Sequence, residues 1–297
     1  MSVAAPERDL PALLRLLRPL HWVKNLFVLA PMVFARELFH LGTAETALGA
    51  FLGFCAVASA VYILNDMADA GADRAHPEKR RRPLAAGTVS RARALGLCAL
   101  LLAAASGISL LMPPLYGAAL GSYFLLNLLY SYRLKDIVLV DVFVIAAGFI
   151  LRVLAGAFAI GVAVSSWIIL CTLFLSLFFA FAKRRSELVS ATGRMPERKT
   201  LAAYRVEFLD QMLTIAAAGT VVSYALYTVA PRTVNLLGTD NLIYTTPFVL
   251  FGIFRYLHLL HTTRSAENPT RAVVADPAIL GVVVLWIAAC VALLYVS

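Results

Sequence analysis

Long apolar runs alternate along this chain with short segments rich in polar and charged residues. Nine of the runs come close to the roughly 20 residues that an α-helix needs to cross hydrocarbon. They lie near residues 21–37, 44–64, 93–112, 115–132, 137–159, 165–182, 211–230, 242–260 and 277–296. The pattern predicts an all-α polytopic membrane protein with about nine transmembrane helices. The first run contains Lys24, Asn25 and Pro31, so a broken or partly buried helix is the alternative there.

Composition supports a membrane protein. Of the 297 residues, 61% are hydrophobic and 14% are charged, a balance too apolar for a water-soluble core beneath a polar surface. In a soluble protein the formal net charge of +9 would suggest nucleic acid as a partner. Here the cations fall in alternate loops, which is typical of membrane topology, so we expect the bilayer as a partner and no nucleic acid.

The cation-rich segments predict the orientation in the membrane. Lys and Arg concentrate near the N-terminus and after every second apolar run, whereas the intervening connectors, such as 159–165, hold almost none. By the positive-inside rule, the N-terminus and the cation-rich loops are cytoplasmic. We therefore expect one multi-pass domain over residues 1–297 in the cell inner (plasma) membrane. Its cytoplasmic cap loops are expected near 65–92, 133–136 and 183–211.

The second apolar run leads into the sequence NDMADAGADRAHPEKRRRP at 65–83. On a helix, Asn65, Asp69 and Asp73 recur every four residues and Asp66 precedes Asp73 by seven, so their side chains converge along one stripe. Hard oxygen ligands suit Mg²⁺, which accepts one or two protein carboxylates and takes its other ligands from water and substrate phosphate. The stripe therefore predicts a Mg²⁺ site at the mouth of a membrane helix. The alternative is an ordinary mixture of charges where a helix enters water.

Further polar residues near the predicted cytoplasmic face are candidates for binding a phosphorylated substrate. They are Lys79, Arg80, Arg82, Lys135, Lys183, Arg184, Glu187 and Tyr204. The segment 183–211 is too long for a turn and has helix-like periodicity, so we expect it to cover the site as a lid. An amphipathic connector on anionic headgroups is the alternative for this segment, and a surface tyrosine is the alternative for Tyr204.

Ionisable residues inside apolar runs form two more candidate groups. Asp141 and Arg152 share one helical face of the fifth run, and intramembrane charges usually mark function. An ion pair that orients helices is the alternative, although about 16 Å of helical rise separates the two residues. Lys24 and Asn25 form the other group, with Lys24 a candidate phosphate ligand.

The NDxxDxxxD pattern at 65–73, followed by basic residues, resembles the UbiA family of intramembrane prenyltransferases. Three further stretches look like the branch that contains decaprenyl-phosphate phosphoribosyltransferases: RPLHWVKNLFVLAPMVF at 18–34, YSYRLKDIVLVDVFVIAAGFILRVLAG at 130–156 and AKRRSELV at 182–189. The resemblance implies a bundle of nine helices around a polar cavity open to the cytoplasm. It also implies that the Mg²⁺ ligands and catalytic side chains are Asn65, Asp66, Asp69 and Asp73. It allows a homo-oligomer without locating an interface.

One departure from the wider family bears on the substrate. Prenyltransferases of this family carry a second Asp-rich motif between the sixth and seventh helices, and here that region is mainly basic. One acidic cluster beside many cations suits phosphoribosyl pyrophosphate as donor and a polyprenyl phosphate as acceptor. The resemblance thus implies a Mg²⁺-dependent phosphoribosyltransferase. The alternatives are a prenyltransferase that alkylates an aromatic acceptor with a polyprenyl diphosphate, and a non-catalytic lipid-binding or transport protein.

Overall fold

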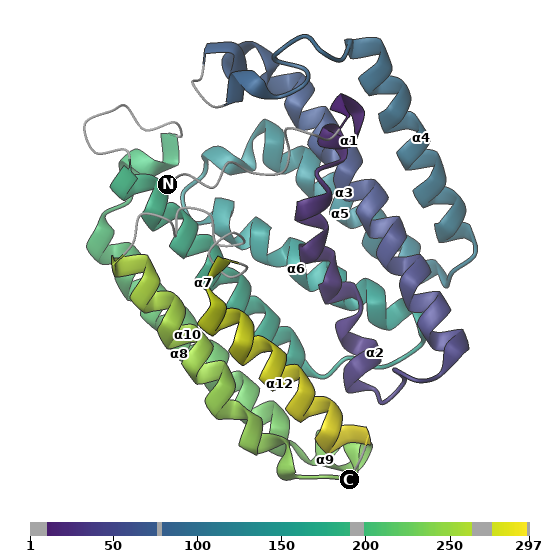
Figure 1. Ribbon diagram of the computed structural model, residues 1–297, viewed down its shortest axis with the longest axis vertical. Helices are drawn as coiled ribbons and strands as arrows, with labels where there is room; N and C mark the ends of the chain where they lie inside the picture. The colour runs from purple at the N-terminus through teal and green to yellow at the C-terminus, as the bar shows by residue number, and fades with distance from the viewer. Residues whose placement is uncertain (1–10, 76–78, 191–198, 263–274, 296–297) are drawn as a thin grey trace. The chain divides into compact units, whose positions relative to one another are not determined.

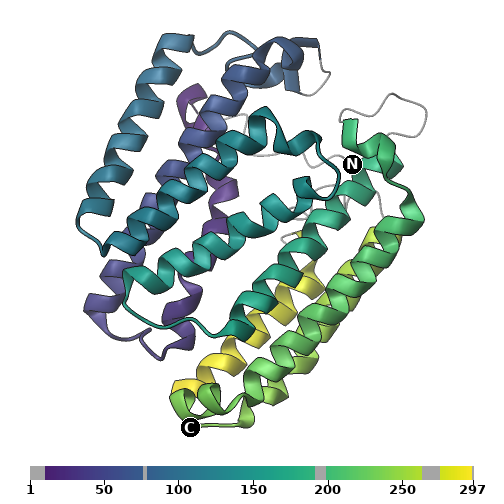
Figure 2. The ribbon, with the colours of Figure 1, turned by 180° about the vertical axis from the view of Figure 1, so that it is seen from behind.

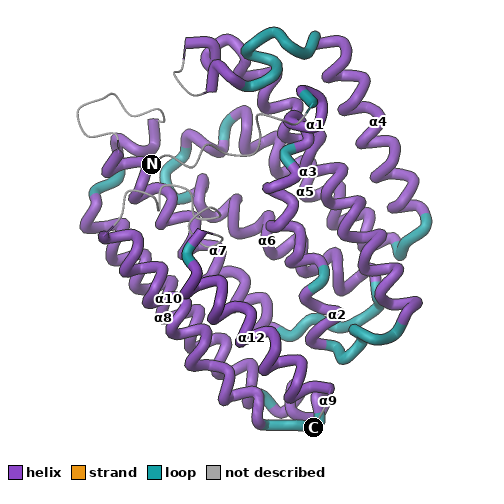
Figure 3. Tube along the Cα trace, in the orientation of Figure 1, coloured by secondary structure: helices purple, strands orange, loops and turns teal. Residues whose placement is uncertain are grey.

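The computed structural model describes residues 11–75, 79–190, 199–262 and 275–295. Within these ranges all regular structure is helical, as the tube in Figure 3 shows, so the predicted all-α class is confirmed. The chain packs as two compact units, and each is described by itself.

The first unit lies within Met1–Val33, Glu37–Ser131 and Leu151–Val162. Its elements are α1 (Ala12–Leu17), the 3-10 helix η2 (Pro19–Val28), most of α2 (Ala30–Phe34), α3 (Leu41–Ala75), η3 (Lys79–Arg81), α4 (Arg91–Leu110), α5 (Pro114–Tyr132) and the second half of α6 (Val140–Ala159). The long helix α3 packs against both α4 and η2, and α4 runs beside it in Figure 1. Phe54, Tyr116 and Tyr123 form an aromatic group within this unit's core.

The second unit lies within Phe34–Arg36, Tyr132–Ile150 and Ala163–Ser297. Its elements are η4 (Leu134–Asp136), the first half of α6, α7 (Ser166–Ser190), η5 (Lys199–Ala203), α8 (Val206–Val229), α9 (Pro231–Leu237), η6 (Asn241–Thr245), α10 (Thr246–Thr262) and α12 (Pro277–Tyr295). Helix α7 packs along α8, and α10 packs along α12, which Figure 2 shows from behind. Phe178, Phe179 and Tyr256 pack edge to face in its core.

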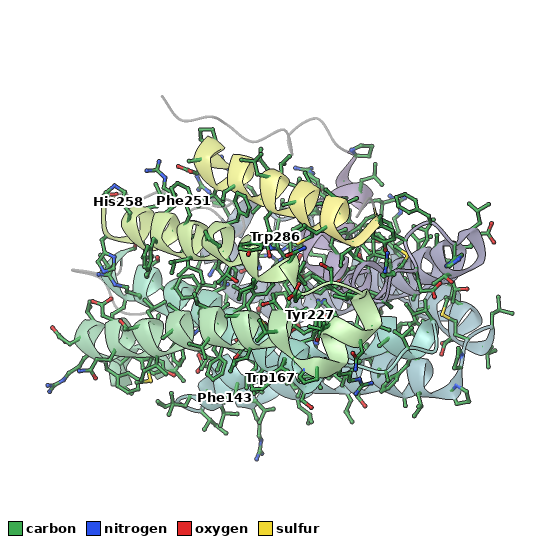
Figure 4. All side chains as sticks on the ribbon, turned by 90° about the horizontal axis from the view of Figure 1, so that it is seen from below. Phe143, Trp167, Tyr227, Phe251, His258 and Trp286 are labelled. Atoms are coloured by element: carbon green, nitrogen blue, oxygen red, sulfur yellow. The ribbon has the colours of Figure 1, made fainter. Side chains whose placement is uncertain are left out.

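Aromatic side chains also join α8 to α12 within the second unit. Figure 4 labels Tyr227 on α8 and Trp286 on α12. The ring of Phe34 contacts both, with centroids 5.7 Å and 6.3 Å away. The indole Nε1 of Trp286 donates to the Tyr224 hydroxyl at 2.9 Å, so these two buried polar atoms are paired.

Seven helices in the described residues are long and apolar enough to cross a membrane, so the predicted count of nine is not confirmed. The first run, 21–37, is broken into η2 and α2, as its polar residues and Pro31 allow. Helix α5 has 19 residues but is not among the seven, because its tyrosines, serines and Asn127 lower its hydropathy. The chain is nevertheless a multi-pass membrane protein, since seven of its described helices are long and apolar enough to cross a membrane.

Two helices extend beyond the apolar runs that predicted them. Helix α3 continues through the acidic stripe to Ala75, and α7 continues through Lys183 and Arg184 to Ser190. Part of each predicted cap loop is therefore helical. The rest of the predicted lid falls partly on residues 191–198, outside the described residues.

Candidate functional site

The acidic stripe of α3 presents two buried carboxylates to a single arginine. Asp66 and Asp73 are 3% and 4% exposed. They lie seven residues apart, or two helical turns, and therefore on one face of α3. Arg82, which follows η3, donates from Nη1 to Asp66 Oδ1 at 3.2 Å and to Asp73 Oδ2 at 2.7 Å. The predicted stripe is thus helical, and Asp66 and Asp73 converge on one nitrogen.

A second guanidinium reaches the same cluster from the N-terminal segment. Arg18 Nη2 donates to Asp66 Oδ1 at 2.5 Å, and the guanidinium carbon lies 5.0 Å from the centre of the Tyr62 ring. Arg18 joins α1 to η2 with a left-handed backbone, φ 51°, which is unusual for a residue other than glycine. Sequence reasoning had not identified Arg18 as part of the site, because it lies 48 residues from Asp66 and no local spacing connects them.

Asn65 and Asp69 are placed differently from the buried pair. The Ser131 hydroxyl on α5 donates to Asn65 Oδ1 at 2.5 Å, which fixes the orientation of the amide toward α5. Asp69 lies on α3 between the other acids and is partly exposed. A metal role for Asn65 and Asp69 stays a prediction, as it does for the buried pair.

The residues of this cluster fit a divalent cation. The positively charged Nη1 of Arg82 lies within hydrogen-bond distance of one oxygen of Asp66 and one oxygen of Asp73. The two carboxylates are therefore close enough to bind the same cation. Among the described residues, no group of three or more His, Cys, Asp or Glu side chains is arranged to hold a metal alone. Mg²⁺ in proteins usually binds one or two carboxylates and takes its other ligands from water and phosphate.

Arg152 of α6 has its own buried partners in the first unit. It is 5% exposed, donates from Nε to Asn25 Oδ1 and from Nη2 to the Tyr123 hydroxyl, both at 2.8 Å, and lies 4.5 Å from the centre of the Tyr123 ring. The Asn25 amide in turn donates to Cys55 Sγ at 3.2 Å. These contacts join η2, α3, α5 and α6. Lys24 on η2 is partly buried.

The other cations of the first unit lie on η3. Lys79 is partly buried and Arg80 is exposed, so both side chains are reached by solvent. Their predicted contacts with donor phosphate stay predictions.

In the second unit, a buried network joins α6 to the end of α7. Arg184 is 1% exposed and donates from Nε to Asp141 Oδ2 at 2.6 Å and from Nη1 to Glu187 Oε2 at 2.5 Å. Lys183 Nζ lies 3.9 Å from the other oxygen of Glu187. Three of the predicted substrate-binding residues are therefore brought together. Two carboxylates neutralise Arg184, whose burial indicates that it positions α6 and α7.

Tyr204 completes this network from the segment before α8. Its hydroxyl donates to Asp141 Oδ1 at 3.0 Å and accepts the Leu139 N–H at 2.8 Å. Leu139 has φ 66°, so this hydrogen bond holds a left-handed residue at the start of α6. Burial, partly offset by the Leu139 hydrogen bond, raises the pKa of the Tyr204 phenol to about 12, and the Asp141 carboxylate adds to the rise. Lys135, on η4 in the same unit, is partly buried.

The Tyr204→Phe variant should lose about 1–3 kcal/mol of unfolding free energy at neutral pH, because Asp141 and Leu139 each lose a partner. The native phenol keeps its proton to about pH 12, whereas unfolded tyrosine releases it near pH 10. In that window the unfolded state binds fewer protons, so the stabilisation by Tyr204 is lost as the pH rises. Thermal unfolding in detergent should show the gap between wild type and variant narrowing above pH 10.

The matched control is Tyr244→Phe, whose side chain on η6 is 72% exposed. It should leave the unfolding free energy at neutral pH unchanged. A gap between wild type and Tyr204→Phe that stayed constant from pH 8 to about pH 12 would contradict the protonated, buried state of Tyr204.

Comparison with known proteins matches residues 26–275 to the UbiA prenyltransferase family. The decaprenyl-phosphate phosphoribosyltransferase of Corynebacterium glutamicum is 38% identical over 230 residues, which cover 75% of this chain and 68% of that protein. The protein of the same name from Mycolicibacterium smegmatis is 35% identical over 244 residues, 80% of this chain and 76% of that protein. A UbiA homolog from Archaeoglobus fulgidus, solved with GPP and Mg²⁺, has a TM-score of 0.72 at 20% identity, covering 96% of this chain and 99% of that one. At that identity the structural likeness concerns the fold alone.

Proposed function

Since this chain belongs to the UbiA prenyltransferase family, we propose that it transfers 5-phosphoribose from phosphoribosyl pyrophosphate to a polyprenyl phosphate in the membrane. One observation carries the choice of substrates. Relatives 35% and 38% identical over at least three quarters of this chain are named decaprenyl-phosphate phosphoribosyltransferases. The basic region after α7, where the wider family has a second acidic motif, supports the same choice.

Mg²⁺ is the proposed cofactor, and Asp66 and Asp73 are its principal proposed ligands. Asp69 and Asn65, on the same helix, are proposed to complete the ligand set directly or through water. When bound there, Mg²⁺ would neutralise charge on the diphosphate as it leaves.

Four cations of the first unit are proposed to bind the donor's phosphates. Lys79, Arg80 and Arg82 belong to or follow η3, and Lys24 lies on η2, so all four come from short elements of the first unit. Asn25 and Arg152 are proposed to hold η2 in place through their buried hydrogen bond.

From the second unit, Lys183 and Lys135 are the proposed phosphate ligands. The Lys183 side chain is 46% exposed, so a soluble substrate can reach it. Arg184, Glu187 and Tyr204 are proposed to position α6 and α7, because their polar atoms already bond to one another or to Asp141.

The chemistry requires little proton transfer. An oxygen of the lipid phosphate attacks the anomeric carbon of ribose, forming a C–O bond, while the C–O bond to pyrophosphate breaks and pyrophosphate leaves with the electron pair. The attacking oxygen is already deprotonated near neutral pH, so no general base is needed. The protein contributes positioning and electrostatic stabilisation through its arginines and lysines.

The test is transfer of label by the purified protein. With Mg²⁺, labelled phosphoribosyl pyrophosphate and a polyprenyl phosphate in detergent, label should enter the lipid phase and pyrophosphate should be released in equal amount. No transfer, combined with activity on a polyprenyl diphosphate and an aromatic acid, would favour the prenyltransferase alternative. No bond formation with either pair would favour a binding or transport protein.

We also propose that the N-terminus and the cation-rich loops face the cytoplasm. In a background lacking the four native cysteines, Ala202→Cys tests the segment before α8, and Asn235→Cys tests α9. Both positions are exposed. An impermeant maleimide added to intact cells should label the Asn235→Cys variant and not the Ala202→Cys variant until the cells are lysed. The reverse pattern would overturn the orientation.

A further inference from the structure

Among the described residues, two arginines balance the charge of the two buried carboxylates of α3. Asp66 and Asp73 are buried, and buried carboxylates need a paired cation. Arg18 neutralises Asp66, and Arg82 bridges Asp66 to Asp73. Two buried negative charges thus face two guanidinium groups. A divalent cation that joined them without displacing either arginine would leave an excess of two positive charges.

The two arginines are not equally placed to move. Within the part of the chain that the structure describes, the Arg18 guanidinium bonds to Asp66 and not to Asp73, and it lies over the face of the Tyr62 ring. Arg82 contacts both carboxylates with the same nitrogen. Departure of Arg82 would free Asp73 Oδ2 and leave Asp66 Oδ1 bonded to Arg18 alone, whereas departure of Arg18 would leave both carboxylates bonded to Arg82. Arg82 is therefore the group that a cation bridging Asp66 and Asp73 must replace.

We propose that Arg82 is the resident counter-cation of Asp66 and Asp73 and that it changes partner, from the two carboxylates to a diphosphate, when a divalent cation binds. The inference rests on the proposed function for the identity of the site. A guanidinium released beside the metal has the planar donor pattern that pairs with phosphate oxygens. Metal and diphosphate then bind cooperatively, because the diphosphate stabilises the state that the metal requires.

The exchange predicts opposite effects of one substitution on two affinities. Arg82→Gln removes the cation that competes with the metal. Because Arg82 makes two charge-assisted hydrogen bonds to the carboxylates, Mn²⁺ alone should bind at least about tenfold more tightly to this variant. At saturating Mn²⁺, labelled inorganic pyrophosphate should bind about tenfold more weakly, because its arginine partner is gone. Electron paramagnetic resonance reports free Mn²⁺ in the first titration, and equilibrium dialysis measures pyrophosphate in the second.

Matched variants separate charge from structure. Arg81→Gln changes the neighbouring exposed arginine on η3 and should leave both affinities unchanged. Arg82→Lys keeps the charge, so Mn²⁺ affinity should stay close to that of wild type. Gel filtration and tryptophan fluorescence establish that each variant is folded, and an unfolded Arg82→Gln is replaced by Arg82→Met in the same pair of titrations.

Each outcome decides the proposal. Weaker binding of both ligands by Arg82→Gln would mean that Arg82 only supports the fold, and unchanged pyrophosphate affinity would mean that it does not change partner. Either result overturns the exchange. Neither titration contains a phosphoribosyl donor or a lipid phosphate. Tighter Mn²⁺ binding and weaker pyrophosphate binding by Arg82→Gln would therefore support the exchange even if the transfer assay failed. Successful transfer without these two changes in affinity would overturn only the proposed role of Arg82.

Discussion

Replacing Asp73 with asparagine should reduce phosphoribosyl transfer at least about a hundredfold, the scale of effect expected when one group of a preorganised electrostatic site is removed. The asparagine keeps the size of the side chain and loses the negative charge that we propose for Mg²⁺. Asp66 keeps both of its arginines, so the acidic cluster retains most of its contacts. Initial rates measured over a series of Mg²⁺ concentrations should show that high Mg²⁺ restores only part of the activity.

Glu45→Gln is the matched control. Glu45 is an exposed carboxylate on the same helix, about 42 Å of helical rise from Asp73. Its replacement should leave the rate unchanged. A folded Asp73→Asn protein with the full rate of wild type would show that the stripe on α3 is not the metal site.

Replacing Gly156 with alanine should lower the unfolding free energy by about 3 kcal/mol, at the upper end of what overpacking usually costs. A Cβ atom at this position would lie 1.9 Å from the carbonyl oxygen of Val28 and 2.8 Å from its carbon. Both atoms are backbone, so no side-chain rotation relieves the clash. Either η2 or α6 has to shift, which would disturb the Arg152–Asn25 hydrogen bond between them. Thermal unfolding in detergent, followed by intrinsic fluorescence, measures the loss.

Gly107→Ala is the control for Gly156. Gly107 lies within α4, and a Cβ atom there meets nothing within 4 Å. Alanine is the better helix former, so this variant should be as stable as wild type or more stable, by up to about 1 kcal/mol. Equal stability of the two variants would mean that η2 and α6 do not approach as closely as the structure indicates.

Hydropathy and local spacing were sufficient to predict most of the long helices and the helical form of the acidic stripe. Hydropathy marks each apolar run, and the seven-residue step from Asp66 to Asp73 is itself the geometry of one helical face. The ends of the helices were harder to predict. Hydropathy stops where the chain leaves hydrocarbon, but the α-helical hydrogen bonds of α3 and α7 continue into polar sequence.

The partners of the charged residues could not be read from the sequence. Arg18 reaches Asp66 across 48 positions, and Arg152 reaches Asn25 across 127. Such contacts depend on how helices pack, which a single sequence does not encode as a spacing. The buried state of Arg184 was missed for the same reason. Beside Lys183 and Arg185 it reads as one cation of three, yet two carboxylates surround it.

The 35 residues of α3 measure about 52 Å, well beyond the roughly 30 Å of a bilayer's hydrocarbon even at the average tilt of about 20°. Asp66 and Asp73 lie in its last three turns. A site there would work at the depth of the lipid headgroups, where a water-soluble sugar donor and the phosphate of a long-chain lipid meet while the tail stays dissolved in the bilayer. The transferred pentose would remain on the leaflet where it was attached. Its passage to the opposite leaflet would then be a separate event.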